Sequence, residues 1–428
     1  MKFGENKMEI NIDKKLLELA DQAEKELKPY FAKAHEVCEK NSRKVLEAFV
    51  SNNVSYQDFQ EINGYGFYDG GRDKIEKVFA DVLGAEDALV RPHIMSGTNA
   101  IWLSLSGLLH HGDTMVSITG LPYDPLQNIV GVTGNSKHSL INNGVKYEQI
   151  ELIDNDFDYE TIRKRIEKKD VTLVEIQRSR GYSHREGMSI AQIEKVCKMI
   201  KEIDPRVIIM VDNCYGELVE EVEPTAVGAD IIAGSLMHNI GGGVATSGGY
   251  IAGKEKYIYE IAERLTAPCI AKDLGANYNQ NIKFLKGLYM APQTVCNAVK
   301  TAIFASYMLE KLGYNVSPRY NLTRTDIVQT FDFGKREDLI KFCQGMQKGS
   351  PIDSFATPVP CEFPGYSHDE IMAAGTFTSG STIELTCDAP VIEPFTGFMQ
   401  GGMTYEYGKL GVLMGLTNLL DPNSQAIE

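Results

Sequence analysis

The stretch RVIIMVDNCYGE, residues 206–217, is the part of the sequence that decides the fold class. Five consecutive apolar residues precede Asp212, and a short apolar run of this kind is typical of a strand that is buried on both faces. Ligand sites in open α/β sheets form at the carboxyl ends of such strands. Asp212 is therefore a candidate to pair with a cationic group of a ligand. The alternative is an aspartate that ends the strand and caps the next turn.

Similar β-rich runs lie on both sides of this stretch. We predict strands at 88–94, 114–119, 146–152, 171–177, 206–212, 229–235 and 248–254. Helical segments separate several of them, such as residues 99–109 and 190–203. This alternation predicts an α/β domain whose sheet is mainly parallel and covered by helices on both faces.

The ends of the chain have different patterns. Residues 14–50 carry apolar side chains at helical spacing with a break at Pro29, and a glycine-rich segment then leads into a helix near Asp73. After Pro292 we expect a helix at 295–312 and then mixed segments that fit a smaller α+β domain. The predicted division is an N-terminal arm and glycine-rich loop (1–75), a large α/β domain (76–291) and a small C-terminal domain (292–428).

Composition excludes several classes of protein. The 43 Lys and Arg against 58 Asp and Glu give a net charge of −15, which disfavours nucleic acid and anionic membranes as partners. No stretch reads as a signal peptide or a transmembrane helix, so we expect a soluble cytoplasmic protein. The eight cysteines are scattered without ligand spacing, which favours reduced thiols over disulfides or a metal site.

Two loops carry candidate ligand-binding residues. The segment SGTNA, residues 96–100, follows a predicted strand and opens a helix, so backbone amides around Ser96, Gly97 and Thr98 could hold a phosphate. The alternative is that Ser96 is only a helix cap. In GSLMHNIGGG, Ser235 and His238 follow another strand and precede a triple glycine, which favours close approach of a ligand or positive φ angles.

Aromatic and basic residues follow two further strands. Tyr123 could stack on a planar ligand, and the arginines of residues 177–185 could hold a carboxylate or a phosphate. An ordinary turn tyrosine and a solvated basic loop are the alternatives. Taken together, the chain order of these features resembles that of pyridoxal-phosphate enzymes of the aspartate aminotransferase fold.

The sequence resembles the cystathionine and methionine gamma-lyase-related family often labelled aluminium resistance protein. The resemblance covers nearly the whole chain and rests on long strings, among them GYGFYDGGRDKIE, RPHIMSGTNAI, GLPYDPL, IQRSRGYSHR, VDNCYGE, EPTAVGADIIAGSL and QGGMTYEYGK. It implies fold type I of the pyridoxal-phosphate enzymes, with a large mainly parallel sheet domain and a smaller α+β domain. It also implies a carbon–sulfur lyase-like activity on an amino acid.

The resemblance implies roles for individual residues. The backbone of Gly97 and Thr98, together with Ser235, would hold the phosphate of pyridoxal phosphate. Tyr123 would stack on its ring, and Asp212 would pair with its protonated nitrogen. Such lyases build each site at a subunit interface, so a homodimer or homotetramer is expected. Tyr68 and Arg72 would then reach the phosphate of the neighbouring subunit.

His238 departs from the family pattern, in which this position is the lysine that forms the internal aldimine. An imidazole forms no Schiff base, so the cofactor would bind non-covalently or arrive as an external aldimine or as pyridoxamine phosphate. Histidine can still move a proton near neutral pH. Three interpretations follow, namely a lyase-like enzyme with His238 as base, a His-based elimination or dehydration enzyme, and a catalytically silent paralogue or Lys-to-His variant. Gln293 and the segment 375–390 also depart from the family wording.

Overall fold

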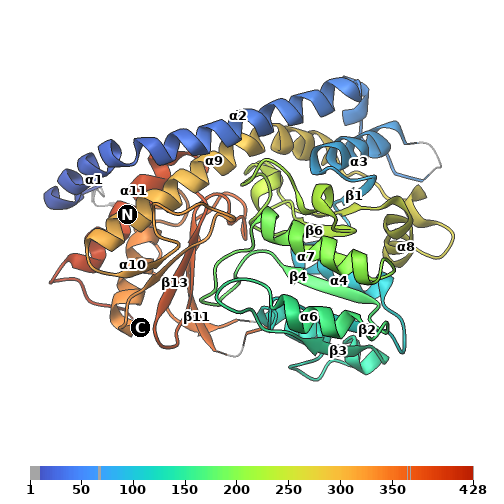
Figure 1. Cartoon of the computed structure of the whole chain (residues 1–428). Helices are drawn as coiled ribbons and strands as arrows, with labels where there is room; N and C mark the ends of the chain where they lie inside the picture. The colour runs from blue at the N-terminus through green and yellow to red at the C-terminus, as the bar shows by residue number, and fades with distance from the viewer. Residues whose placement is uncertain (1–9, 66–68, 364, 367, 428) are drawn as a thin grey trace.

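The computed structural model describes residues 10–427 except residues 66–68, 364 and 367. Two β-sheets lie side by side beneath two long helices, α2 (Lys28–Ser51) and α9 (Asn281–Lys311) (Figure 1). These helices pack against each other and extend across both sheets. The two sheets therefore share one helical cover.

The larger sheet has the strand order β1-β7-β6-β5-β4-β2-β3. All neighbouring strands run parallel except β7, which is antiparallel to both β1 and β6. The bounds are β1 Asp87–Arg91, β2 Thr114–Ser117, β3 Lys146–Gln149, β4 Leu173–Gln177, β5 Ile208–Asp212, β6 Ile231–Ser235 and β7 Gly249–Gly253. Each overlaps a predicted strand, with β1 beginning one residue before the predicted start, so the predicted, mainly parallel sheet is confirmed.

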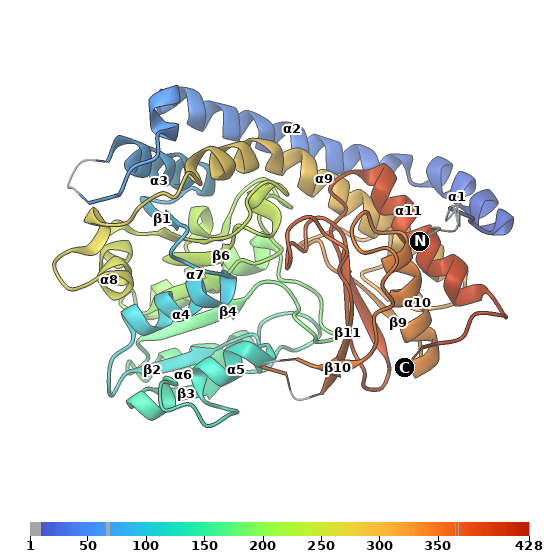
Figure 2. The same ribbon diagram turned by 180° about the vertical axis from the view of Figure 1, so that it is seen from behind.

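Helices cover both faces of this sheet (Figures 1 and 2). One face packs against α3 (Gly70–Leu83), α6 (Tyr159–Ile166) and α7 (Ile190–Ile203), and the other against α4 (Gly97–Leu108), α5 (Asp124–Val130) and α8 (Glu255–Leu265). The residues of β5 before Asp212 are all apolar because both faces of this strand are buried. Ile209 and Val211 belong to one core, whereas Ile208 and Met210 belong to the other.

The smaller sheet is antiparallel, in the order β10-β11-β12-β13-β9-β8. Helices α10 (Arg336–Lys348) and α11 (Tyr405–Leu420) pack together on the side away from the larger sheet (Figure 2). The strand bounds are β8 Asn315–Ser317, β9 Gln329–Asp332, β10 Cys361–Glu362, β11 Asp369–Ala373, β12 Thr386–Pro390 and β13 Thr396–Gln400. The predicted α+β character of the C-terminal part is confirmed.

The N-terminal arm breaks close to the predicted position. One residue, Leu27, separates helix α1 (Lys14–Glu26) from α2. Pro29 lies in the first turn of α2, where a missing backbone N–H costs no helical hydrogen bond. Asp69 caps α3 by accepting a hydrogen bond from the Arg72 amide, so this helix begins slightly before the predicted position. Single-turn 3₁₀ helices lie at Tyr56–Phe59, Ile141–Asn143, Pro224–Val227, Asn239–Gly241 and Ala271–Asp273.

The predicted start of a helix at residue 295 is wrong. Helix α9 begins at Asn281 and continues through Pro292. The proline removes one hydrogen bond of the ladder, but α9 is buried along most of its length, and this packing holds the helix together. The boundary predicted between residues 291 and 292 therefore falls inside a continuous helix.

Two further findings apply to the described residues alone. None of their helices combines the length and the hydrophobicity that a membrane span requires. Their His, Cys, Asp and Glu side chains form no group of three or more that could hold a metal ion.

Candidate active site

A cavity of about 250 Å³ lies between the two sheets. One wall comes from the carboxyl ends of the larger sheet's strands and the loops that follow them. We call it the large-domain wall, and it consists of Ser96, Gly97, Thr98, Tyr123, Pro125, Gln177, Ser179, Gly181, Tyr182, Asp212, Cys214, Tyr215, Ser235, Met237 and His238. The other, which we call the small-domain wall, consists of Val328, Tyr366, Asp388, Phe398 and Gln400.

The cavity brings together seven of the nine predicted site residues, namely Ser96, Gly97, Thr98, Tyr123, Asp212, Ser235 and His238. Arg72 is not among the lining residues. It lies in the first turn of α3, is 3% exposed, and has the Asp73 carboxylate 3.6 Å from its Nε. Tyr68 lies outside the described residues. The predicted reach of these two residues to a neighbouring subunit stays a prediction.

The start of α4 forms one end of the large-domain wall. The Ser96 hydroxyl caps the helix by accepting a hydrogen bond of 3.1 Å from the Asn99 amide, and Ser96 also lines the cavity. The amides of Gly97 and Thr98 lie before Asn99 in the first turn of α4, where no carbonyl of the helix can accept their hydrogen bonds. A Cβ on Gly97 would come within 3.1 Å of Cys214 Sγ and 3.2 Å of Ser235 Cβ. Glycine therefore allows these amides to lie directly beside the end of β6.

Tyr123 is fixed at this end by two contacts. Its hydroxyl shares a hydrogen bond of 3.1 Å with Thr98 Oγ1, and its amide donates to Gln177 Oε1 at 3.0 Å. Burial and the nearby charge of Asp212 raise the pKa of the Tyr123 phenol well above its ordinary value. The phenol is therefore protonated throughout the physiological pH range, and its ring forms part of the cavity surface.

Asp212 ends β5 and is 4% exposed. Its Oδ1 accepts a hydrogen bond of 3.1 Å from the Cys214 amide. Burial raises the pKa of Asp212 to about 6, although the bonds from Cys214 and the charge of Arg185 act in the opposite direction. The carboxylate thus caps the next turn, as one alternative predicted. Because it also lines the cavity, it can meet a cationic group of a ligand there.

His238 follows β6, and its imidazole is held on two sides. Nδ1 shares a hydrogen bond of 2.6 Å with Thr382 Oγ1, and the ring stacks on Tyr215 with centroids 4.5 Å apart and planes 30° from parallel. Burial lowers the pKa of His238 to about 4, so the ring is neutral at pH 7. A neutral imidazole in this position can accept a proton.

The triple glycine after His238 serves packing rather than close approach of a ligand. Gly242 has φ +58°, and a Cβ there would lie 2.2 Å from the backbone oxygen of Gly287 on α9. Gly243 also has a positive φ. The predicted need for positive φ is confirmed, but the backbone that comes close is that of α9.

The arginines of residues 177–185 do not line the cavity. Arg178 is fully buried and pairs with Glu220 at 2.9 Å and Glu223 at 3.3 Å. Arg180 donates to Ser317, and Arg185 donates to backbone oxygens of Gln177 and Ser179. These arginines are neither solvated nor part of the cavity lining, because their ion pairs and hydrogen bonds hold the end of β4 in place.

The small-domain wall was not predicted. Asp388 on β12 accepts a hydrogen bond of 2.6 Å from Gln400 Nε2 on β13, and Phe398 lies directly opposite Asp388 in the sheet. A carboxylate between the apolar residues Cys387 and Ala389 of β12 is the one signal that could have indicated this wall. Tyr215 and Thr382, which hold His238, come from positions far from it in the sequence and carried no such signal.

The chain is similar to known proteins in both sequence and structure. The sequence model of the methionine gamma-lyase family matches residues 16–420. A candidate cystathionine beta-lyase involved in aluminium resistance from Clostridium acetobutylicum superposes with a TM-score of 0.93 at 44% identity, over 96% of this chain and 97% of that chain. A carbon–sulfur lyase involved in aluminium resistance from Clostridium novyi NT gives 0.92 at 40% identity, over 96% and 97% of the two chains.

A more distant likeness extends the fold assignment. A pyridoxal-5′-phosphate-dependent protein from Escherichia coli superposes with a TM-score of 0.60 at 15% identity, over 89% of this chain and 95% of that chain. At this identity the likeness concerns the fold alone. The architecture is that of the fold type I pyridoxal-phosphate enzymes, and the chain belongs to the methionine gamma-lyase family.

Proposed function

We propose that this protein binds pyridoxal phosphate non-covalently in the cavity between the two sheets and acts as a carbon–sulfur lyase-like enzyme on an amino acid. The observation that carries the proposal is the set of residues on the large-domain wall. Unpaired helix amides, a stacking ring and a buried carboxylate meet in one cavity, whereas its lining contains no lysine among the described residues.

The large-domain wall fits each part of the cofactor. The amides of Gly97 and Thr98, at the positive end of the α4 dipole, and the Ser235 hydroxyl would hold the phosphate. The ring of Tyr123 would stack on the pyridine. Asp212 would pair with the protonated ring nitrogen, and this pairing fits its raised pKa, because a buried carboxylate without a cation beside it is costly to ionise.

Bound pyridoxal phosphate supplies an electron sink for the negative charge left on an amino acid's α carbon after it loses a proton. His238 would accept that proton. Thr382 engages Nδ1, so we assign the transfer to Nε2. The Tyr215 ring keeps the imidazole plane fixed, and the pKa of about 4 keeps the ring in its accepting form at pH 7.

Proton exchange at the α carbon tests this assignment. With pyridoxal phosphate and L-methionine in D₂O, the protein should remove the α-proton signal in the ¹H NMR spectrum faster than free cofactor does. His238→Asn can keep a bond to Thr382 but cannot carry the proton, so the exchange rate should fall by about 10²–10⁴. His184→Asn makes the same change at an exposed side chain outside the cavity and should leave the rate unchanged.

Cofactor binding is measured in the same samples by equilibrium dialysis. Exchange no faster than with free cofactor, although the cofactor is bound, would favour the catalytically silent paralogue. Exchange that survives in the His238→Asn variant would show that another group is the base. A homodimer or homotetramer that acts on a small amino acid remains part of the proposal.

A further inference from the structure

The ring that stacks on His238 belongs to a residue with a strained backbone. Tyr215 has φ +69°, a left-handed conformation that residues with bulky side chains rarely adopt. Its ring nevertheless lies on the imidazole with centroids 4.5 Å apart. A backbone of this kind persists only where the surrounding structure imposes it. The contacts that hold Tyr215 in its conformation therefore also hold the ring that covers the imidazole.

Two hydrogen bonds hold the backbone of Tyr215. Its carbonyl oxygen accepts one of 3.0 Å from Asn239 Nδ2 and one of 3.1 Å from the Ile327 amide. Asn239 Nδ2 also donates to the backbone oxygen of Glu217 at 2.9 Å. One side-chain amide thus joins both ends of the turn 215–217. Asn239 therefore clamps the turn that carries the stacking ring.

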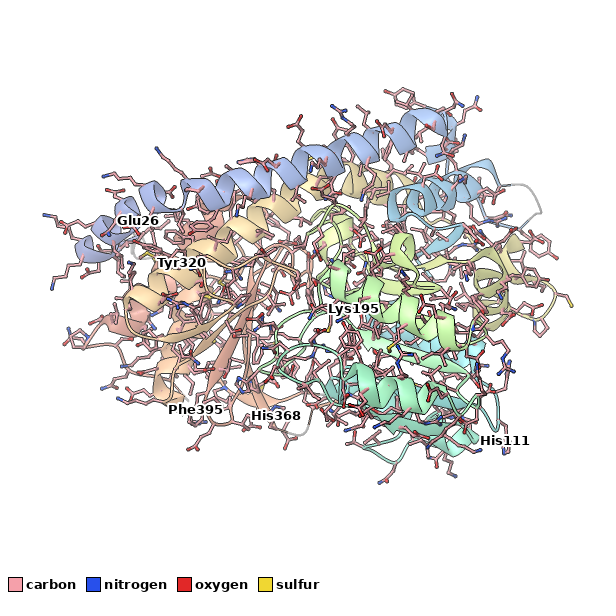
Figure 3. All side chains as sticks on the ribbon, in the orientation of Figure 1. Glu26, His111, Lys195, Tyr320, His368 and Phe395 are labelled. Atoms are coloured by element: carbon pink, nitrogen blue, oxygen red, sulfur yellow. The ribbon has the colours of Figure 1, made fainter. Side chains whose placement is uncertain are left out.

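Asn239 is also the residue that follows His238. It is 0% exposed and begins a 3₁₀ helix, so the backbone that carries the imidazole also carries the clamp. Thr382, which bonds the imidazole at Nδ1, comes from the small domain. Figure 3 shows the side chains that fill the junction between the two domains, with His368 labelled on its small-domain side and Lys195 on its large-domain side. The imidazole is thus held from both sides of this junction.

We propose that Asn239 is a positioning residue for the proposed proton transfer. It holds Tyr215 in the left-handed conformation, and the Tyr215 ring then keeps the imidazole of His238 in one orientation. A base that is held in one orientation transfers a proton faster than one that moves between several. The catalytic consequence rests on the proposed function, whereas the hold of Asn239 on the ring does not depend on the cofactor.

The stack has a spectroscopic signature that tests the clamp. A tyrosine ring on the face of an imidazole shifts the NMR signals of the imidazole protons upfield. In the full-length protein with ¹³C-labelled histidine, the His238 signals are those that disappear in the His238→Asn variant. Tyr215→Leu removes the ring and defines the unstacked position, whereas Tyr215→Phe keeps the stack. We expect Asn239→Leu to move the His238 signals at least halfway to the unstacked position.

Asn41 provides a matched control. Like Asn239, it is 0% exposed, and its Nδ2 donates to two backbone oxygens, those of Leu218 at 2.9 Å and Glu220 at 3.1 Å. These oxygens come later in the same loop. Either Asn→Leu change deprives two backbone oxygens of a donor, so urea unfolding should show losses of stability of similar size. Asn41→Leu should nevertheless leave the His238 signals in place.

Proton exchange tests the catalytic consequence. With pyridoxal phosphate and L-methionine in D₂O, Asn239→Leu should slow exchange of the α proton by about ten- to a hundredfold, because the imidazole loses its fixed orientation. Asn41→Leu should leave the rate unchanged. Both variants should keep the cofactor affinity, measured by equilibrium dialysis. If Asn239→Leu does not fold, Asn239→Ser takes its place, since a serine hydroxyl is too short to reach both backbone oxygens.

The outcomes separate this inference from the proposed function. His238 signals that stay in place in the Asn239 variant would overturn the clamp, and so would an equal displacement in Asn41→Leu. Displaced signals with an unchanged exchange rate would overturn the positioning role of Asn239 in proton transfer. Absence of cofactor binding or of exchange in the unmodified protein would overturn the proposed function. The NMR signals would then still decide whether Asn239 holds the Tyr215 ring.

Discussion

The two walls of the cavity have similar electrostatics but different origins. Each contributes one aspartate, Asp212 or Asp388, and burial raises the pKa of both to about 6. Asp212 lies at the carboxyl end of a parallel strand, where its fold class places ligands. Asp388 lies inside an antiparallel strand and takes its position from pairing with β13. The fold class therefore accounts for the first wall, and only the specific sheet register accounts for the second.

Cofactor affinity should separate the two walls most strongly. Asp212→Asn should weaken binding of pyridoxal phosphate by about a hundredfold, because it removes the charge that pairs with the ring nitrogen. Asp388→Asn should change that affinity by less than about threefold. Equilibrium dialysis at pH 7.5 measures both. Similar losses in the two variants would mean that the walls do not divide cofactor and substrate between them.

The pH dependence of protein stability should show the property that the two walls share, an aspartate whose pKa is raised by burial. Each aspartate has a folded pKa of about 6, above its ordinary value of 3.8, so the folded state binds the proton more tightly. This contribution to stability is present below about pH 4 and is lost as the pH rises through 6. In cofactor-free protein, the effect of either Asp→Asn change on the free energy of unfolding should therefore be more stabilising at pH 7.5 than at pH 4, by on the order of 1–3 kcal/mol.

Urea unfolding of the unmodified protein and both variants at the two pH values measures this difference. An effect of the same size in both variants would mean that the two aspartates are equally costly to ionise. The walls would then differ in the groups that they bind. An effect in one variant alone would mean that the other aspartate already has a cation beside it in the cofactor-free protein.

The large-domain wall could be predicted because its signals are local in the sequence. An apolar run that ends in Asp212 predicts a buried parallel strand, and the SGTNA turn predicts a helix start with free amides. Strands that run in the same direction end at the same edge, so these residues were expected to meet. The missing lysine at position 238 could also be recognised, because the resemblance to the family implies a lysine where this chain has His238.

The other features of the site and the start of α9 could not be predicted, because they depend on tertiary structure. Asp388 and Gln400 come together only through the register of β12 on β13, which short strands and irregular turns do not reveal. Tyr215 and Thr382 hold His238 from segments 23 and 144 positions away. The start of α9 was misplaced because Pro292 is a strong helix-ending signal, and here packing against α2 and the glycine loop outweighs it.

No lysine lines the described part of the cavity, so non-covalent binding of the cofactor is the central claim, and borohydride reduction tests it most directly. Reduction fixes a cofactor that is bound to a lysine through a C=N bond and leaves one that is bound non-covalently free to leave. After reduction of the loaded protein and denaturation, we expect the intact mass to be unchanged and all the cofactor to be released. His238→Lys is the positive control, since it supplies a primary amine and should retain a pyridoxyl group. A pyridoxyl group on any lysine of the unmodified protein, Lys272 for instance, would contradict the account.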